Sequence, residues 1–401
     1  MILLLRIRNV MIGLPLALSL IVLCGWGYAS YEGARFHARV ALLKRDGLPT
    51  NLKELKPAEV ADKDNADFFI RQAMPSIQSL DREFAELSDL DRGEMSDEIA
   101  SKLTELFAAH PELFATIERA SICEQYVPNL DYDAKPQAFS MQSLEHVNNL
   151  RNAARIMNIR MRHLVHVGHP EEAVDIGVNG LRLCRRVKQP RLMIDLIVVL
   201  ASRGILMSAL NEVLQTSTLS PESHRRIAEE LSSFDPQKEL QVSIVQERAY
   251  GLASVADQRF ALWIHANALL DLFEQEIDSA TNEEFQYQFH EVPDGWQTVL
   301  AKLLQPSLLS TRQNVSGHVA TQRCLQIVNA WKAAGAPIDA TIETLVSDKV
   351  SRRDPYSGAD LIVRVLPKGL LVYSVGSNRS DDGGQVETGK DRGWTHPKNA
   401  K

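Results

Sequence analysis

Near the carboxyl end of the chain, oxygen-bearing side chains occupy alternate positions, the pattern that begins a calcium-binding loop. Asn378, Ser380 and Asp382 stand directly before Gly383. Calcium takes six to eight oxygen ligands, and such a loop supplies them from alternate residues before a glycine turn. The match is incomplete, because asparagine replaces the usual first aspartate and Gly389 occupies the twelfth place, where glutamate is expected. Calcium is the one cofactor that the sequence suggests, and a solvated turn without metal is the alternative.

Three histidines form a second candidate site, because His163, His166 and His169 follow one another at intervals of three. On a helix, this spacing places the first two on adjacent turns. Zinc requires three or four ligands, and no further ligand stands nearby. Arg160 and Arg162 add positive charge that disfavours a cation. We therefore expect solvated helix histidines and no metal site here.

The familiar catalytic templates are missing from the sequence. It contains no His-Glu-x-x-His, no Gly-x-Ser-x-Gly and no phosphate-binding Gly-x-x-x-x-Gly-Lys-Ser/Thr motif. The four cysteines have no metal or redox spacing; Cys24 lies in an apolar stretch, and the other three are far apart, which leaves one long-range disulfide open. The sequence therefore favours a non-enzymatic protein, with no catalytic residue assigned.

The N-terminal region predicts a membrane anchor. Residues 9–31 contain no charged side chain and are rich in leucine, isoleucine and valine. A helix rises about 1.5 Å per residue, so about 20 apolar residues cross the ~30 Å hydrocarbon core of a bilayer. A cleaved signal peptide is the alternative, but its apolar region is usually only ~7–15 residues long. Trp26, Tyr28 and Tyr31 also suit a membrane interface, so we predict an uncleaved transmembrane helix.

Basic residues flank both ends of this predicted span, so the charge rule alone does not set its orientation. They are Arg6 and Arg8 before it, and Arg35, Arg39, Lys44 and Arg45 after it. A short tail followed by a large globular region is typical of a signal-anchor. We therefore predict a cytoplasmic tail over residues 1–8 and a periplasmic or otherwise extracytoplasmic location for the bulk of this single-pass protein.

The composition describes a globular protein with a substantial core. The chain has 401 residues, of which 45% are hydrophobic and 24% charged. Its net charge is −7 and its isoelectric point is about 5.9. Nucleic-acid-binding proteins normally carry a basic face, so the charge argues against a nucleic-acid partner.

Helical periodicity dominates from residue 32 to residue 350, which we interpret as one α-helical domain. Short connections favour antiparallel neighbours, so we expect a mainly α fold built as an antiparallel bundle or an irregular solenoid. The hairpin around Gly168, Ala173 and Gly180 resembles one tetratricopeptide repeat, although no sustained period of ~34 residues follows. The predicted helices cover residues 34–45, 67–80, 97–109, 111–123, 141–167, 171–188, 191–215, 221–233, 238–277, 296–304, 309–334 and 340–350.

The composition changes near residue 351, where turn residues and β-branched residues predict a β-hairpin cap over 351–384. Its strands are expected at 361–365 and 370–375. Alternation suggests that Val363 and Val365 on the first strand, and Tyr373 and Val375 on the second, pack against the helical domain. Residues 385–401 are polar, so we expect a disordered tail there.

A set of short segments spread over most of the chain carries a family resemblance. The segments are Leu48-Pro49 and Glu54-Leu55 followed by Asn65-Ala66, Gly168 with Glu171-Glu172-Ala173, Gln246-Glu247-Arg248-Ala249, Asp354-Pro355-Tyr356-Ser357-Gly358, Val372-Tyr373-Ser374-Val375-Gly376 and Asp381-Asp382-Gly383-Gly384. Together they resemble a family of membrane-anchored helical proteins of planctomycete-type bacteria. The resemblance implies an exported helical domain with a small β cap, in a family without an established activity.

The last forty residues are also similar to the calcium-binding C-terminal loop of the major pseudopilins of type II secretion. The similarity lies in an Asp-Pro…Gly turn, a Tyr-Ser strand end and the acidic Asp381-Asp382-Gly383-Gly384 loop. A pseudopilin begins with a cleavable signal and a glutamate just inside the mature helix, and residues 9–31 contain none. The resemblance therefore implies a shared cap and not pilus assembly.

Taken together, these observations predict a membrane-tethered helical scaffold of the cell envelope that binds protein partners without catalysis. The alternative is a membrane-anchored hydrolase whose site the sequence does not reveal. A cleft that gathers His, Asp or Glu side chains with perturbed pKa values would favour the hydrolase.

Overall fold

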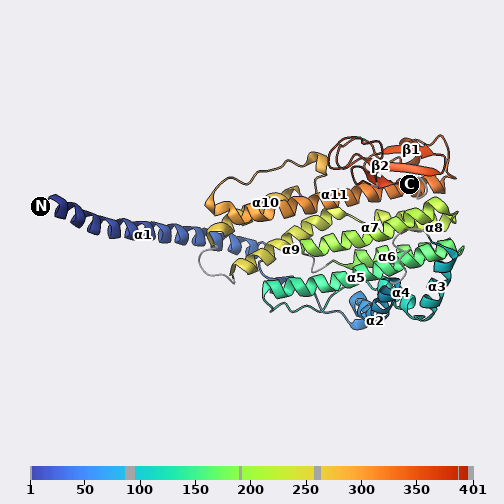
Figure 1. Ribbon diagram of the computed structural model, residues 1–401, viewed down its shortest axis with the longest axis horizontal. Coiled ribbons are helices and arrows are strands. Elements are labelled where there is room, and N and C mark those ends of the chain that lie inside the picture. Colours follow the sequence, from blue (N-terminus) through green and yellow to red (C-terminus); the bar gives the residue numbers. More distant parts are fainter. Residues whose placement is uncertain (1, 86–94, 189–191, 257–262, 387, 396–401) are drawn as a thin grey trace.

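A computed structural model describes residues 2–85, 95–188, 192–256, 263–386 and 388–395; the side chains of residues 2–17, 263, 264 and 284 lie outside this description. The described part is mainly helical, with a small antiparallel sheet near the C-terminus (Figure 1). This confirms the predicted helical class with a small β element.

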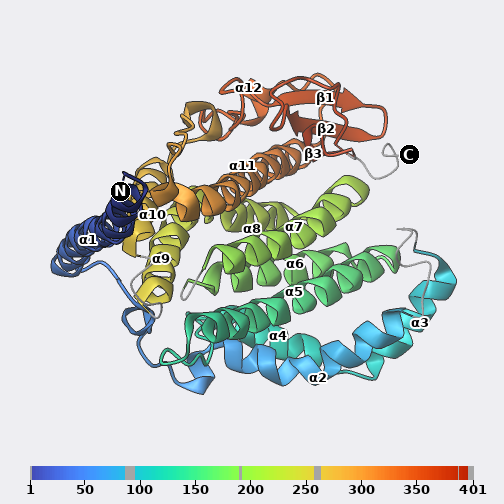
Figure 2. The same ribbon diagram turned by 60° about the vertical axis from the view of Figure 1, so that its left-hand side comes forward.

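One long helix, α1 (Ile2–Arg45), projects from one end of a body in which the other helices pack side by side (Figures 1 and 2). Its second half packs on the body through Phe36 and Leu43, which share a buried cluster with Leu252 and Leu270. The body helices are α2 (Ala66–Ala85), α3 (Asp97–Ala108), α4 (Leu113–Ile122), α5 (Pro136–His166), α6 (Pro170–Arg186), α7 (Met193–Thr216), α8 (Pro221–Ser232), α9 (Pro236–Ala256), α10 (Trp263–Ser279), α11 (Val299–Ala333) and α12 (Ile342–Leu345). Short 3-10 turns η1 (Leu52–Leu55), η2 (Asp62–Asp64), η3 (Glu284–Gln286) and η4 (Trp296–Thr298) connect them.

Close packing of α6 between α5 and α7 forms the centre of the body. A Cβ atom added at Gly177 would lie 2.7 Å from Leu210 of α7 and from Met161 of α5, and Gly180 has a similar environment. Gly177 therefore lets three helices approach closely, together with Gly180, one of the small residues on which the resemblance to a tetratricopeptide repeat was based. Among the described residues, α7 is the helix that is long and apolar enough to cross a membrane, but 67% of its apolar window is buried in the body. A helix in the core of a protein body passes the same test of length and composition, so this is weak evidence for a membrane span.

Two helix predictions were wrong in their continuity. The interval 296–334 is mostly one helix, α11, which continues through Pro306. Ala301 and Leu308 on either side of this proline are buried in the same cluster, so packing compensates for the lost backbone hydrogen bond. Conversely, the predicted helix at 238–277 is divided into α9 and α10, with residues 257–262 between them outside the described part.

The C-terminal sheet has the order β1-β2-β3 and consists of β1 (Ile362–Leu366), β2 (Gly369–Ser374) and β3 (Arg392–Trp394). The hairpin register pairs Val363 with Val372. Leu370 and Val372 belong to the main core, and Val363 packs against it, so the expectation for β1 was right. The predicted inner face of β2 was wrong: Tyr373 lies on the opposite face, where its hydroxyl donates to Asp381 (2.9 Å). Both faces of β2 are buried, so alternation alone could not identify the inner one.

The predicted disorder after residue 384 does not extend through the described tail, because β3 pairs with β2 there. Asp391, fully buried, precedes β3 and accepts hydrogen bonds from the amides of Gly384 (2.8 Å) and Gln385 (2.9 Å). Asp354 holds the end of β2 by accepting from Ser374 Oγ (2.8 Å) and the amide of Val375 (3.0 Å). Buried carboxylates thus satisfy backbone donors that no strand partner reaches.

Glycine is required in this cap at some positions for its positive φ and at others also for a close approach of the backbone. Comparing one position of each kind separates the two effects. Gly376 and Gly383 both have positive φ, at 68° and 82°. A Cβ at Gly376 would lie 2.2 Å from the backbone oxygen of Lys390, whereas one at Gly383 would meet nothing within 4 Å. Gly383→Ala should therefore cost only the left-handed strain, about 1–2 kcal/mol.

Gly376→Ala should add the cost of moving the backbone, ~1–3 kcal/mol more, because its neighbour is not a flexible side chain. Denaturant unfolding of the two variants measures both values. Equal destabilisation would contradict the close approach of residues 376 and 390.

Candidate functional site

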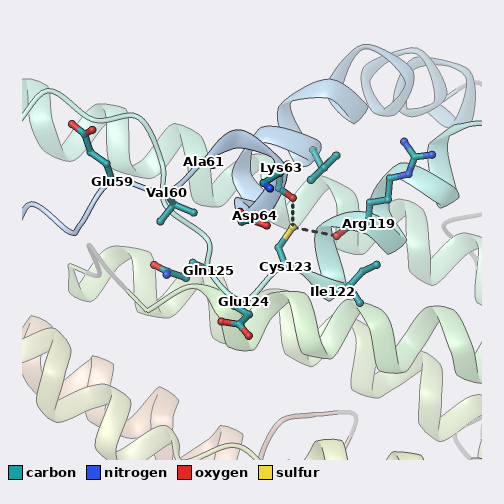
Figure 3. Close-up of a pocket in the computed structure, with 11 residues that line it drawn as sticks. Glu59, Val60, Ala61, Lys63, Asp64, Arg119, Ile122, Cys123, Glu124 and Gln125 are labelled. Carbon is teal, nitrogen blue, oxygen red and sulfur yellow. Dashed lines mark hydrogen bonds between the residues drawn. The ribbon is translucent and has the colours of Figure 1, made fainter.

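A surface cleft of about 600 Å³ lies between the loop that precedes α2 and the C-terminal end of α4 (Figure 3). Its lining combines charged, polar and apolar side chains from these two segments. They are Glu59, Val60, Ala61, Lys63, Asp64, Phe69, Arg119, Ile122, Cys123, Glu124 and Gln125.

A buried asparagine joins the two walls of the cleft. Asn65 Nδ2 donates to the carbonyl oxygen of Val127 (2.8 Å), and its Oδ1 accepts from the amides of Val127 (2.9 Å) and Asp67 (3.1 Å). The amide of Ala66 donates to the carbonyl oxygen of Gln125 (2.8 Å). The Asn65-Ala66 pair singled out in the sequence therefore holds an extended segment against the start of α2. The shape of the cleft depends on this amide.

Cys123 lies at the floor of the cleft, but its environment does not activate the thiol. Its Sγ donates to the carbonyl oxygen of Arg119 (3.3 Å) and lies 3.9 Å from that of Lys63 (Figure 3). Burial and then the charge of Asp64 raise the pKa of this thiol. Nucleophilic cysteines need a lowered pKa, so Cys123 is a buried neutral thiol.

The charged groups of the cleft do not converge on one point. In Figure 3 the side chains of Glu59, Glu124 and Arg119 point away from one another. Ile122 at the rim keeps 66% of its surface exposed. A catalytic site needs a nucleophile, a base and a charge stabiliser within reach of one reacting atom, and this lining lacks that geometry.

A second cavity, about 230 Å³, contains the most perturbed histidine of the described residues. His318 on α11 lines it beside Asn314 and Arg392, and its Nε2 has no partner in the described part of the chain. Burial, followed by the positive charge of Arg203, lowers the pKa of His318 to about 3. A general base works best with a pKa near the operating pH, so this histidine is poorly matched to that role.

The predicted calcium ligands lie together in one loop, where they bond to one another. Asn378 Nδ2 donates to an Asp382 carboxylate oxygen (2.7 Å), and Asn378 Oδ1 accepts from the amide of Ser380 (3.1 Å). Lys390 Nζ lies 3.9 Å from the other Asp382 oxygen. Among the described residues, no group of three or more His, Cys, Asp or Glu side chains could hold a metal ion. Calcium binding stays a prediction, which the melting temperature with calcium and with chelator would test.

The three predicted histidines have three separate environments. His163 is buried, in contact with Thr104 Oγ1 (2.9 Å) and Arg160 (3.1 Å), and burial followed by Arg160 lowers its pKa. The expectation that it is solvated was wrong. His166 Nε2 bonds to Asp97 (2.8 Å), and His169 Nδ1 lies 3.0 Å from Glu172. The structure does not bring the three rings together.

Glu247, a glutamate of α9, lies against the first residue of α7, and the sequence did not identify it as a group that titrates near neutral pH. Glu247 on α9 accepts from the amide of Met193 (3.0 Å), while Asp195 accepts from Ser143 Oγ and the amide of Leu192 (both 2.8 Å). Desolvation raises the pKa of Glu247 to about 7, and nearby Asp195 adds to the shift. The only sequence signal was a glutamate inside an otherwise core-forming helix, which does not distinguish it from surface glutamates.

Comparison with known proteins adds no family assignment. No family model, curated protein or solved structure matches the chain.

Glu247 predicts how stability depends on pH. The folded-state pKa is raised above the unfolded value, so the stabilisation is fully present below about pH 4.5 and is lost as the pH rises through about 7. The loss should reach at most about 3 kcal/mol. Glu247→Gln should remove this part of the pH dependence of unfolding, whereas Glu83→Gln, at an exposed position on α2, should leave it unchanged. An identical pH profile for Glu247→Gln and the parent protein would refute the assignment.

Proposed function

We propose that the protein is a membrane-tethered helical scaffold of the cell envelope, with residues 9–31 of α1 as its single transmembrane anchor. The supporting observation is the surface of α1 where it leaves the body. Its apolar side chains are exposed on successive positions around the helix, not along one stripe. They include Leu18, Leu20, Ile21, Val22, Leu23 and Trp26, all at least 55% exposed. Contiguous exposed apolar surface of this kind requires a covering phase, and a bilayer covers all sides of a helix at once.

A rigid connection between anchor and body is consistent with tethering. Asn267 of α10 donates to the Glu32 carboxylate (2.7 Å) and to the Glu32 carbonyl oxygen (3.0 Å). About two turns further along α1, Arg39 pairs with Asp271 (2.7 Å) and Glu274 (2.8 Å). Because α1 continues as one helix from the apolar half into these contacts, the body would hold a defined direction relative to the membrane. The helical array behind it then acts as an antiparallel bundle that displays its outer surfaces.

The cleft of Figure 3 is the partner-binding surface that we assign to this scaffold. Its chain from Glu59 to Ala61 belongs to no helix, and none of its three backbone amides donates to another backbone group of the described residues. An extended partner segment could pair with such a chain while its side chains meet Phe69 and Ile122. The divergent charges and the neutral thiol of Cys123 favour recognition over hydrolysis in this cleft.

The anchor is tested by extraction and by charge insertion. The full chain should stay in the membrane pellet after alkaline carbonate washing and should begin at or near Met1. Leu18→Arg and Leu20→Arg should each cost about 2.5–3.5 kcal/mol of insertion free energy at the centre of the span. Leu42→Arg is the control, because Leu42 is an exposed apolar residue of the same helix beyond the span. A soluble form that begins near Ser30 would contradict the anchor.

The partner surface is tested by a pull-down of the tagged protein from detergent extract at native expression. Ile122→Asp should reduce the recovery of co-purifying proteins, because it places a charge at the apolar rim of the cleft. Met141→Asp is a matched control, since Met141 is 67% exposed and Ile122 66%, and Met141 does not line the cleft. Equal recovery with both variants would reject the cleft as the binding surface, and an empty pull-down with the parent protein would remove the main support for scaffolding.

A further inference from the structure

An apolar patch lies beside the base of the apolar half of α1. We call it the end face and define it by Tyr28 of α1, Trp296 of η4, and Val299 and Leu303 at the start of α11. Trp296, Val299 and Leu303 are 55%, 47% and 71% exposed. Val299 and Leu303 are four residues apart on one helix, so they share a side of it. The start of α11 lies at the end of the body from which α1 projects (Figure 1).

Direct contacts fix the depth of this patch relative to α1. The rings of Tyr28 and Trp296 lie 5.6 Å apart between centroids, and Gln297 Nε2 donates to the Tyr28 hydroxyl (3.3 Å). His265 on α10 packs edge-on against the same indole at 6.4 Å. Tyr28 belongs to the last turn of the uncharged stretch 9–31. Trp296 therefore lies level with the last turn of this stretch.

The charges around the end face are balanced. Lys302 pairs with Asp294, and Arg35 lies 4.0 Å from Glu32. A surface that is apolar at its centre and neutral at its rim gains little from anionic headgroups, while tryptophan and tyrosine favour the headgroup region of any bilayer. The chemistry of the patch therefore fits the interface of a neutral lipid membrane.

We propose that the end face inserts into the headgroup region of the bilayer beside the anchor, so that the body stands directly on the membrane. This inference rests on the proposed anchor and extends it, because a tether alone would allow the body to lie away from the lipid. Insertion of Trp296 and Leu303 gives the body a second membrane contact. A second copy of the chain covering the same patch is the competing outcome.

The test uses full-length protein in phosphatidylcholine vesicles, with Cys24→Ala removing the one exposed cysteine. An environment-sensitive NBD dye is attached at Leu303→Cys or, separately, at Val299→Cys. Ile338→Cys is the matched control, because Ile338 is also exposed, at 87%, and follows the opposite end of the same helix. The dye at 303 and at 299 should show blue-shifted emission and be quenched by lipids that carry a nitroxide near the headgroup, and the dye at 338 should show neither effect. Adding anionic phosphatidylglycerol or salt should leave the quenching unchanged.

Vesicle flotation of the same samples separates the two hypotheses. Protein that floats with the vesicles while the dyes at 303 and 299 remain water-exposed would overturn the insertion of the end face and leave the anchor intact. A blue shift without quenching by lipid nitroxide, lost when the protein is diluted, would instead show that a second copy covers the end face. Protein that does not float would reject both the anchor and the insertion of the end face.

Discussion

The packing of the second half of α1 on α10 is the interaction on which the arrangement of the whole molecule depends. From Leu18 to Trp26 the helix exposes apolar side chains on several sides, and from Glu32 onward it has a buried side and a solvated side. The change occurs where Asn267 binds both the backbone and the side chain of Glu32. Without these contacts, nothing would fix the direction of α1 relative to the body. With them, the direction of α1 and the position of the end face are set together, since α10, η4 and α11 pack on one another.

A second constraint recurs throughout the body: irregular segments are held by buried polar side chains that bind backbone amides. Asn65 joins the walls of the cleft, Asp195 caps the start of α7, Asp354 holds the residues at the end of β2, and Asp391 holds the loop at Gly384. Buried amides must find partners, and each of these loops lacks a neighbouring strand to provide them. The acidic residues of the cap that suggested a metal therefore also have a structural use. Asp391, which the calcium pattern did not include, organises the loop by accepting hydrogen bonds from its amides.

The positions of the side chains with shifted pKa values bear on whether the protein has a catalytic centre. Glu247, His318 and Cys123 all have shifted pKa values, but each occupies a different part of the molecule. Desolvation is the main cause in all three cases, and it favours the neutral form of each group. Because the pKa of each group differs between the folded and unfolded states, each makes the free energy of unfolding depend on pH. A catalytic centre would require them to face one reacting atom, and the described clefts do not bring them together.

Local sequence patterns were enough to predict the helical and strand segments, because secondary structure depends largely on local periodicity. Amphipathic spacing predicted most of the helices, proline and glycine predicted turns such as that at Gly168, and β-branched runs predicted β1 and β2. The uncharged length of residues 9–31 likewise follows from the sequence alone. Local periodicity also explains the errors: Pro306 suggested a helix end, and the polar residues after 384 suggested disorder, since neither pattern reveals what packs against it.

Tertiary structure alone decided which surfaces meet. The inner face of β2 depends on the hairpin register and on the loop that covers Tyr373, and β3 exists only because β2 offers it an edge. The cleft combines residues about 60 positions apart through Asn65, and the end face combines Tyr28 with Trp296 across more than 260 residues. Such contacts depend on the summed burial and hydrogen bonding of many distant groups, which no local pattern records. The candidate surfaces of this protein are therefore properties of its packing.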